Sequence, residues 1–133
     1  MAVDCIGICK FHTMFLSPNM PNFKEFSELI RLVTDLDIPP GELWKIADRC
    51  YTLERLFNLR EGFTREDDWL VDRYFDEPTD AGLEVVRNKA IDRDKFARMI
   101  DEYYEHHGWD DKGVPTKETL EKLGIAAEPS HKL

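Results

Sequence analysis

The sequence predicts a mainly α protein, a compact helical domain of four to six helices with irregular connections. Apolar residues recur at three- and four-residue steps along most of the chain, and strict apolar–polar alternation is nearly absent. Prolines and glycines mark the ends of these apolar segments, where helices commonly stop. With 133 residues the chain has the length of one ordinary domain, so we expect a single core.

The first two predicted helices cover residues 23–37 and 40–61. Asn22 is placed to cap the first, which ends before Pro39. Pro40 opens the second as a first-turn proline, and Gly62 follows its end. The apolar positions at helical spacing are Phe23, Phe26, Leu29, Ile30 and Val33 in the first helix and Leu43, Ile46, Ala47, Cys50, Leu53, Leu56 and Phe57 in the second.

The middle of the chain is less regular. Thr64 and Asp67 have the spacing of a capping box, and the pattern after them predicts one short helix that ends before Pro78. Residues 79–90 are interpreted as a connecting loop, with a short extended piece at residues 83–86. The short helix is predicted from Trp69, Leu70, Arg73 and Tyr74.

Two further helices are predicted toward the end of the chain. Asp92 or Asp94 caps the first of them, which stops at Gly108. Thr116 caps a last helix over residues 117–123, which Gly124 closes, and residues 126–133 form a polar tail. An apolar stripe on the first of these helices is interpreted as core; it comprises Phe96, Met99, Ile100 and Tyr103.

Composition excludes several classes of function. Charged residues make up 34% of the chain and no apolar run approaches the length of a bilayer span, so a membrane protein is excluded. The net charge of −9 would repel a phosphate backbone, which argues against nucleic-acid binding. The start of the chain lacks the pattern of a signal peptide, and three cysteines do not suggest a disulfide framework. We therefore expect a cytoplasmic protein.

The segment around residues 4–11 places an acid, a glycine and a thiol within an otherwise apolar stretch. The Asp4 carboxylate could accept paired hydrogen bonds from a planar donor edge such as that of a pterin. Gly7 would let backbone approach a bulky ligand, and a Cys9 thiolate could bind iron. Taken alone, these residues favour a structural interpretation, because buried cysteines and helix-capping acids are common.

Cys5, Cys9 and His12 also have spacings that suggest a metal site. A structural zinc site usually takes four ligands, and the remaining cysteine, Cys50, lies far along the chain in a core-facing helical position. An independent metal site is therefore the less favoured interpretation. It would predict stoichiometric zinc or iron in the isolated chain, where we expect substoichiometric metal at most.

The remaining titratable clusters are interpreted as structural. His106 and His107 fall in the last turn of a predicted helix, where capping is favoured. The acidic runs at residues 66–68 and 110–111 have the positions of first-turn and loop charges. The chain contains no nucleophilic triad pattern, P-loop or dinucleotide fingerprint, so no catalytic residue is assigned to it.

Asp4-x-x-Gly7-Ile8-Cys9 resembles the Asp-x-x-Gly-Leu-Cys motif near the C-terminal end of the tungsten-containing aldehyde ferredoxin oxidoreductases. Ile8 replaces the usual leucine, a conservative change in an apolar position. Further matches follow in order along nearly the whole chain, at residues 53–63, 65–68, 101–104, 108–110, 113–116 and 120–124.

The resemblance implies a helical C-terminal domain beside a separate N-terminal domain, with a tungstopterin (a molybdopterin-type cofactor) and a 4Fe-4S cluster between them. Asp4 would hydrogen-bond the pterin, Cys9 would ligate the cluster, and Gly7 and Ile8 would complete the motif. In the whole enzyme an aldehyde is oxidised to a carboxylate, and electrons leave through the cluster to ferredoxin. The remaining cluster cysteines and the catalytic residues of the family lie upstream of this motif.

The resemblance therefore predicts an oxidoreductase part that binds no cofactor and is inactive without the missing N-terminal domain or subunit. The alternative is a stand-alone helical protein-interaction module that has lost the cofactors. An exposed apolar face around Ile6, Ile8, Phe11 and Phe15 would favour the first hypothesis. Self-association through that face is expected when the chain is isolated.

Overall fold

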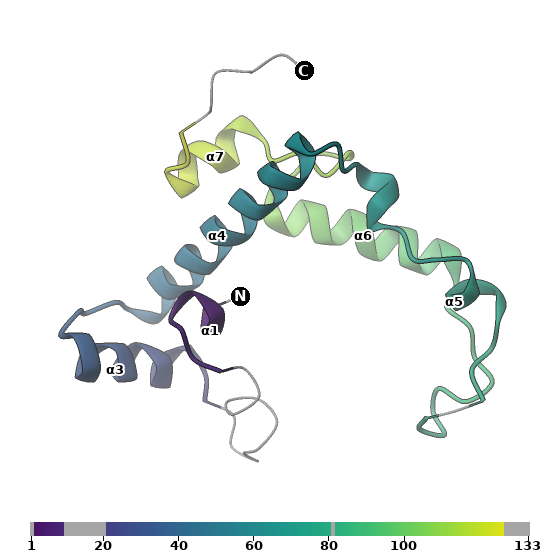
Figure 1. The fold of residues 1–133 in the computed structure, drawn as a ribbon, viewed down its shortest axis with the longest axis horizontal. Helices are drawn as coiled ribbons and strands as arrows, with labels where there is room; N and C mark the ends of the chain where they lie inside the picture. The colour runs from purple at the N-terminus through teal and green to yellow at the C-terminus, as the bar shows by residue number, and fades with distance from the viewer. Residues whose placement is uncertain (1, 10–20, 81, 127–133) are drawn as a thin grey trace. The chain divides into compact units, whose positions relative to one another are not determined.

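A computed structural model describes residues 2–9, 21–80 and 82–126, and these residues form mainly helices (Figure 1). Extended backbone within the described ranges pairs only at two isolated bridges, Thr79 with Lys89 and Trp109 with Pro115. The mainly α prediction is confirmed. The elements are the α-helices α1 (Ala2–Cys5), α3 (Phe23–Thr34), α4 (Pro40–Arg60), α5 (Arg73–Asp76), α6 (Arg93–His107) and α7 (Lys117–Leu123), and the 3-10 helix η1 (Arg65–Asp68).

The chain divides into two compact units by its internal contacts. The first unit comprises residues 1–55 and 120–133, and the second comprises residues 56–119. Both boundaries fall inside helices, α4 and α7, so each of these helices contributes residues to both units. The cofactor-binding motif segment is predicted over residues 1–17, of which the structure describes residues 2–9, and the predicted tail beyond residue 126 lies outside the described residues.

The core of the first unit is an apolar cluster contributed by α1, α3 and α4. Its buried members are Val3, Phe26, Ile30 and Leu43, and the half-buried Ile6, Ile8, Phe23 and Ile38 pack against them. The end of α7 is fixed within the same unit, because Arg49 Nε donates a hydrogen bond of 2.7 Å to the carbonyl oxygen of Leu123.

The predicted cap of α3 is confirmed as a complete capping box. Asn22 Oδ1 accepts from the backbone N–H of Lys24, and Glu25 Oε2 accepts from the backbone N–H of Asn22, each at 2.8 Å. The helix ends at Thr34, three residues before the predicted boundary. Asp35 adopts a left-handed conformation there, with φ of 60°, and this local turn stops the helix before the prolines are reached.

The long helix α4 begins at Pro40, as predicted, and ends in a glycine-containing C-cap. Gly62 has φ of 92°, its N–H binds the carbonyl of Leu59, and the N–H of Phe63 binds the carbonyl of Asn58. This pair of bonds is a Schellman motif, in which glycine takes the left-handed position without a Cβ penalty. The same motif ends α1 at Gly7, α6 at Gly108 and α7 at Gly124.

The structure corrects the prediction of one short helix after residue 64. The capping box of Thr64 and Asp67 is present, but it opens the 3-10 helix η1, and α5 begins only at Arg73. Between them Trp69 is extended, and its ring packs on Phe75 with centroids 5.2 Å apart. Aromatic packing therefore interrupts the helix that the local pattern predicts. α5 ends before Pro78, as expected.

The prediction of an extended piece at residues 83–86 is wrong. The backbone N–H of Val86 binds the carbonyl of Leu83, and turns continue to Asn88. The isolated bridge between Thr79 and Lys89 closes this loop. An extended segment needs a neighbouring strand for its backbone groups, and no strand exists in the described part of the chain, so turns satisfy them instead.

Aromatic residues form the centre of the second unit. The rings of Trp69, Phe75 and Phe96 contact one another with centroid distances of 5.2–5.5 Å, and Phe75 is buried. Arg93 lies over the Phe75 ring at 4.6 Å. The hydrogen bonds that Arg93 donates to Asp76 and Asp72 raise the pKa of its guanidinium group, which therefore stays cationic beside the ring.

The caps of the last two helices agree with the sequence. Asp92, rather than Asp94, caps α6 by accepting from the N–H of Lys95 at 2.9 Å. Thr116 Oγ1 accepts from the N–H of Thr119 at 3.3 Å at the start of α7. The two threonines also donate hydroxyl hydrogen bonds to the carbonyl oxygen of Gly108. The end of α6 and the start of α7 are thereby joined at one carbonyl group.

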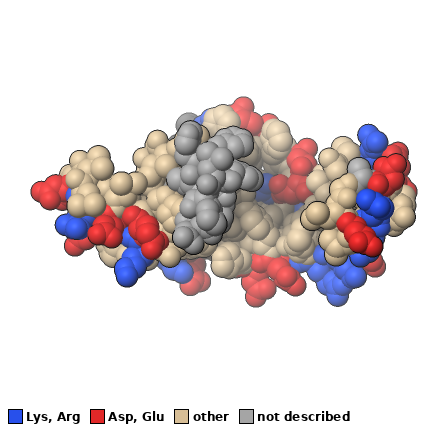
Figure 2. All heavy atoms as spheres, turned by 90° about the horizontal axis from the view of Figure 1, so that it is seen from below, with Lys and Arg blue, Asp and Glu red and all other residues tan. Residues whose placement is uncertain are grey.

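On the face that Figure 2 draws, acidic and basic side chains are interspersed among uncharged ones. Among the described residues, no helix is both long enough and apolar enough to cross a membrane.

Candidate cofactor-binding site

The motif segment begins with a one-turn helix that the sequence pattern did not reveal. α1 ends in a Schellman motif, in which the N–H of Gly7 binds the carbonyl of Asp4 at 3.1 Å and the N–H of Ile8 binds the carbonyl of Val3 at 3.0 Å. An apolar contact usually joins the two residues linked by the second of these bonds, which spans more of the chain. Here both residues, Val3 and Ile8, belong to the core of the first unit.

This turn separates the apolar residues of the segment from the polar ones. Val3 is buried, and Ile6 and Ile8 pack half-buried against the core. Asp4 and Cys9 are exposed, and both have interactions within the chain. The expected exposed apolar face is therefore not found at Ile6 and Ile8; its other members, Phe11 and Phe15, lie outside the described residues.

Gly7 contributes through its backbone conformation. Its φ of 71° lies in the left-handed region, and among the described residues a Cβ placed on it would have no neighbouring atom within 4 Å. Within this chain, therefore, the turn and not steric crowding requires glycine. The open space beside Gly7 is compatible with the predicted approach of a bulky ligand, which stays a prediction.

The thiol of Cys5 lies beside that of Cys50. Burial, and then a hydrogen bond with Cys50, raise the pKa of the Cys5 thiol above its ordinary value. Cys5 ends α1 and Cys50 lies in α4, so this contact joins two elements of the first unit. Sequence reasoning missed it, because the two residues are 45 positions apart; the core-facing position of Cys50 was the only signal.

The proposed metal set of Cys5, Cys9 and His12 cannot be assembled from the described residues. His12 lies outside them, and they contain no group of three or more histidine, cysteine or acidic side chains placed to hold a metal ion. Cys9 itself is exposed at the end of the motif segment. Its role as a single ligand in a larger site therefore remains the prediction to test.

The three thiols should differ in reactivity toward iodoacetamide at pH 8. Alkylation requires the thiolate, and the raised pKa leaves more of Cys5 protonated at this pH. Cys9 is exposed, whereas Cys5 and Cys50 are half-buried. We expect Cys9 to be modified roughly several-fold faster than the other two, as measured by peptide mass spectrometry over time. In urea, where the chain is unfolded, the three thiols should react at similar rates. Equal rates in the native protein as well would contradict this placement of the thiols.

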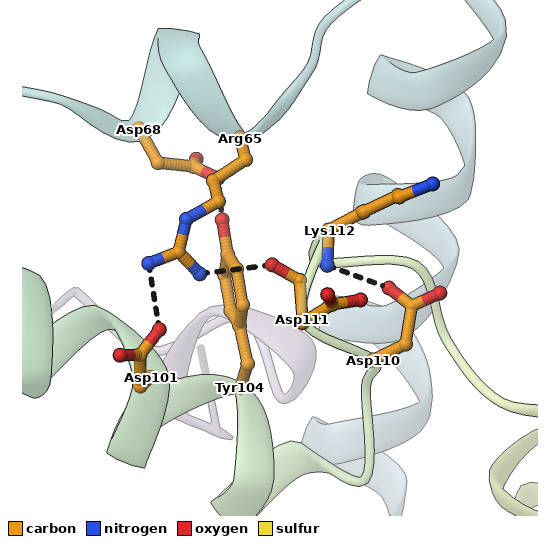
Figure 3. A network of polar contacts seen from close by, with 7 residues as sticks. All are labelled: Arg65, Asp68, Asp101, Tyr104, Asp110, Asp111 and Lys112. Atoms are coloured by element: carbon orange, nitrogen blue, oxygen red, sulfur yellow. Dashed lines mark hydrogen bonds and ion pairs between the residues drawn. The ribbon is translucent and has the colours of Figure 1, made fainter.

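The acidic residues of the second unit take part in a network centred on Arg65 (Figure 3). Arg65 Nη2 forms an ion pair of 2.6 Å with Asp101, and Nη1 donates to the backbone carbonyl of Asp111 at 2.9 Å. Its guanidinium group lies over the ring of Tyr104, whose hydroxyl donates a hydrogen bond to Asp68. One arginine thus connects η1, α6 and the loop that follows α6.

The second acidic run stabilises that loop. Asp110 Oδ1 accepts from the backbone N–H of Lys112 at 3.0 Å (Figure 3). The same oxygen accepts from the backbone N–H of Val114 at 2.8 Å. Together with the cap formed by Asp67, these contacts support the structural interpretation of both acidic runs.

The adjacent histidines occupy the last turn of α6, as predicted, directly before Gly108. A positive charge is favoured at that end of a helix. The ring of His107 also contacts those of Tyr103 and Trp109, with centroids 4.6 and 5.2 Å apart. This aromatic packing was not predicted, because Trp109 follows the helix and reaches His107 only through the turn at Gly108.

Comparison with known proteins identifies the class to which this helical segment belongs. Residues 1–125 match the family model described as "Aldehyde ferredoxin oxidoreductase, domains 2 & 3". The chain therefore belongs to the aldehyde ferredoxin oxidoreductase family, and the resemblance inferred from the motif is confirmed.

Particular relatives include tungsten-containing aldehyde ferredoxin oxidoreductases. The chain is 33% identical to that of Pyrococcus furiosus over 125 residues and 30% identical to that of Thermococcus kodakarensis over 128 residues. It is also 33% identical, over 129 residues, to a Pyrococcus furiosus protein named aliphatic sulfonate oxidoreductase, WOR-like subunit. The matches cover 92–93% of this chain but 19% of each relative, so the chain spans about a fifth of their length.

A solved structure has the same fold. The active-site complex BamBC of benzoyl-coenzyme A reductase, determined with 1,5-dienoyl-CoA, matches with a TM-score of 0.69 and 27% sequence identity. The match covers 92% of this chain and 17% of the benzoyl-coenzyme A reductase chain. In this case too, the helical segment corresponds to a small part of a larger oxidoreductase.

Proposed function

We propose that the chain is the C-terminal helical part of an aldehyde:ferredoxin oxidoreductase. In the whole assembly, an aldehyde would be oxidised to a carboxylate at a tungstopterin, and electrons would leave through a 4Fe-4S cluster to ferredoxin. Membership of the family and the tungsten-containing relatives support this proposal. An aldehyde is proposed as the substrate because the family and these two relatives are named for aldehyde oxidation.

The observation that carries the proposal is the orientation of the motif segment. Val3 and Ile8 anchor both ends of the Schellman motif in the core, whereas Asp4, within the motif, and Cys9, directly after it, are exposed. The Asp4 carboxylate and the Cys9 thiol are therefore at the surface of the unit, while the apolar residues of the turn fix its backbone. A turn fixed by its apolar residues is suited to present these two groups to a ligand.

The donor set fits the implied cofactors. A thiolate is the usual protein ligand of iron in clusters, and Cys9 offers one. The two oxygens of the Asp4 carboxylate can accept paired hydrogen bonds from a planar donor edge. A 4Fe-4S cluster usually takes four cysteine ligands, so three would come from outside this segment. That requirement agrees with a chain that spans about a fifth of its relatives.

Within such an assembly, the residues of this chain would bind and orient rather than react. When bound, tungsten supplies the two-electron chemistry and the cluster supplies single-electron transfer. Asp4 would accept hydrogen bonds from the pterin and thereby fix its orientation. Ile6 and Ile8, packed on the core, would exclude water beneath the motif. The isolated chain, which lacks the other ligands, would be inactive and hold no stoichiometric cofactor.

We expect Cys9→Ala to remove the cluster without unfolding the chain. The side chain is exposed, so its loss costs little packing. Without this thiolate, one iron of the cluster would lack its protein ligand. The chain would be co-expressed with the polypeptide that carries the remaining domains of the oxidoreductase. Iron and tungsten would then be measured by plasma mass spectrometry and helix content by circular dichroism. We expect a loss of most of the iron with unchanged helix content.

Cys50→Ala is the matched control for this experiment. It also removes one thiol, but from a half-buried position in α4, and the iron content should be unchanged. Full iron content in Cys9→Ala would remove Cys9 from the ligand set. If the assembly that contains the unsubstituted chain held neither tungsten nor iron, the result would contradict the proposed function and favour the stand-alone interaction module.

A further inference from the structure

α3 carries more apolar surface than its own unit buries. Phe26 and Ile30 are buried in the core and Phe23 packs against it. Beside this buried face lies a second apolar row on the solvent side. We call this row the α3 stripe; it comprises Leu29, Leu32 and Val33 on the helix and Leu36 directly after its C-cap, all exposed.

The spacing of the α3 stripe is that of a docking surface. Positions 29, 32 and 33 have the i, i+3, i+4 spacing by which one helix presents apolar anchors to the groove of a partner, and Leu36 adds an exposed apolar residue directly after the helix end. The other exposed positions of the helix carry polar residues, among them Glu28 and Arg31. Contiguous exposed apolar rows of this kind are uncommon on monomers and commonly mark interaction sites.

We infer that the α3 stripe is the surface on which the remaining domains of the oxidoreductase dock. This inference rests on the proposed function. About four-fifths of each relative's own polypeptide lies outside the match to this chain, so in those proteins the matched segment belongs to a chain with a much longer remainder. α3 also packs on the same core cluster as the motif segment. A partner that supplied the other cluster ligands would have to contact this unit at Cys9, and the stripe lies on a helix of that same unit.

The test compares two double substitutions in the full chain. Leu32→Glu with Val33→Glu places charges on the α3 stripe, at positions that are 68% and 75% exposed. Leu83→Glu with Val85→Glu is the matched control, in the loop of the second unit, at positions that are 75% and 66% exposed. Each variant would be tagged and co-expressed with the polypeptide carrying the remaining domains. The ratio of the two polypeptides after purification through the tag is the readout.

We expect the stripe variant to retain at least tenfold less of the partner polypeptide and the loop control to stay within twofold of the unaltered chain. Retention within twofold by the stripe variant, or equal loss by both variants, would overturn the inference while the proposed function stands. Failure of the unaltered chain to retain the partner would instead contradict the proposed function, and the inference with it.

Two measurements on the isolated chain exclude other occupants of the stripe. If the chain's own residues covered it, the stripe variant would lose helix content or melt earlier than the loop control. If a second copy covered it, the unaltered chain would sediment as a dimer and the stripe variant as a monomer that still bound the partner polypeptide. Either result would overturn the inference. Leu32→Gln with Val33→Gln, which keeps helix-favouring residues, should reproduce the loss of partner without these effects.

Discussion

Phe75→Ala is expected to destabilise the chain by about 3–5 kcal/mol, the usual cost of removing a buried phenylalanine ring. Phe75 is buried, stacks on Trp69, contacts the edge of Phe96 and lies beneath the guanidinium group of Arg93. Alanine would leave a cavity among these groups and remove the surface on which Arg93 rests. Urea denaturation, followed by tryptophan fluorescence and circular dichroism, measures the loss.

The neighbouring Tyr74 provides the control. Its side chain is exposed, and its backbone hydrogen bonds, including the one that its carbonyl accepts from Ile91, do not depend on the ring. Tyr74→Ala should therefore change the free energy of unfolding by only about 0.5 kcal/mol or less. Similar losses for the two substitutions would show that the aromatic cluster does not form the centre of the second unit.

Gly108→Ala is expected to have the second largest effect on stability. The residue has φ of 67°, a conformation that costs an L-residue about 1–2 kcal/mol. In addition, a Cβ at this position would overlap the hydroxyl oxygen of Thr119. The Thr119 side chain would have to move, which would cost its 2.7 Å hydrogen bond to the Gly108 carbonyl and leave only Thr116 to join α7 to that group.

Gly62→Ala separates the two contributions. Gly62 ends α4 in the same Schellman motif, but a Cβ there would meet no atom within 4 Å. It should cost only the conformational part, about 1–2 kcal/mol, whereas Gly108→Ala should cost clearly more in the same urea titration. Equal losses would mean that contact with Thr119 contributes nothing to the requirement for glycine at position 108.

Features governed by near neighbours were predictable from the sequence. The cap at Asn22, the capping box at Thr64 and the glycine stops at Gly62 and Gly108 depend on residues only a few positions away. Features governed by distant residues were not. The chain extends at Trp69 because of a ring six residues further on, and Arg65 finds its ion-pair partner 36 positions away in Asp101.

The candidate site was likewise only partly predictable from the sequence. The residues of the motif could be named only through the family resemblance, because an acid, a glycine and a thiol have ordinary structural uses. The four-residue helix α1 is too short to produce a periodic pattern, so its existence was missed. The structure adds the division between the anchoring residues, Val3 and Ile8, and the exposed Asp4 and Cys9. The cofactor roles of these residues stay predictions.

The position of the unit boundaries within α4 and α7 bears on how this segment can be dissected. Domains are usually separated by flexible linkers, where proteolysis or truncation leaves the folded domains intact. Here a cut after Arg55 or Thr119 would divide a helix and leave its new end with four orphaned carbonyl groups. Neither unit is therefore suited to expression alone, and deletion mapping of any binding activity should keep both helices whole.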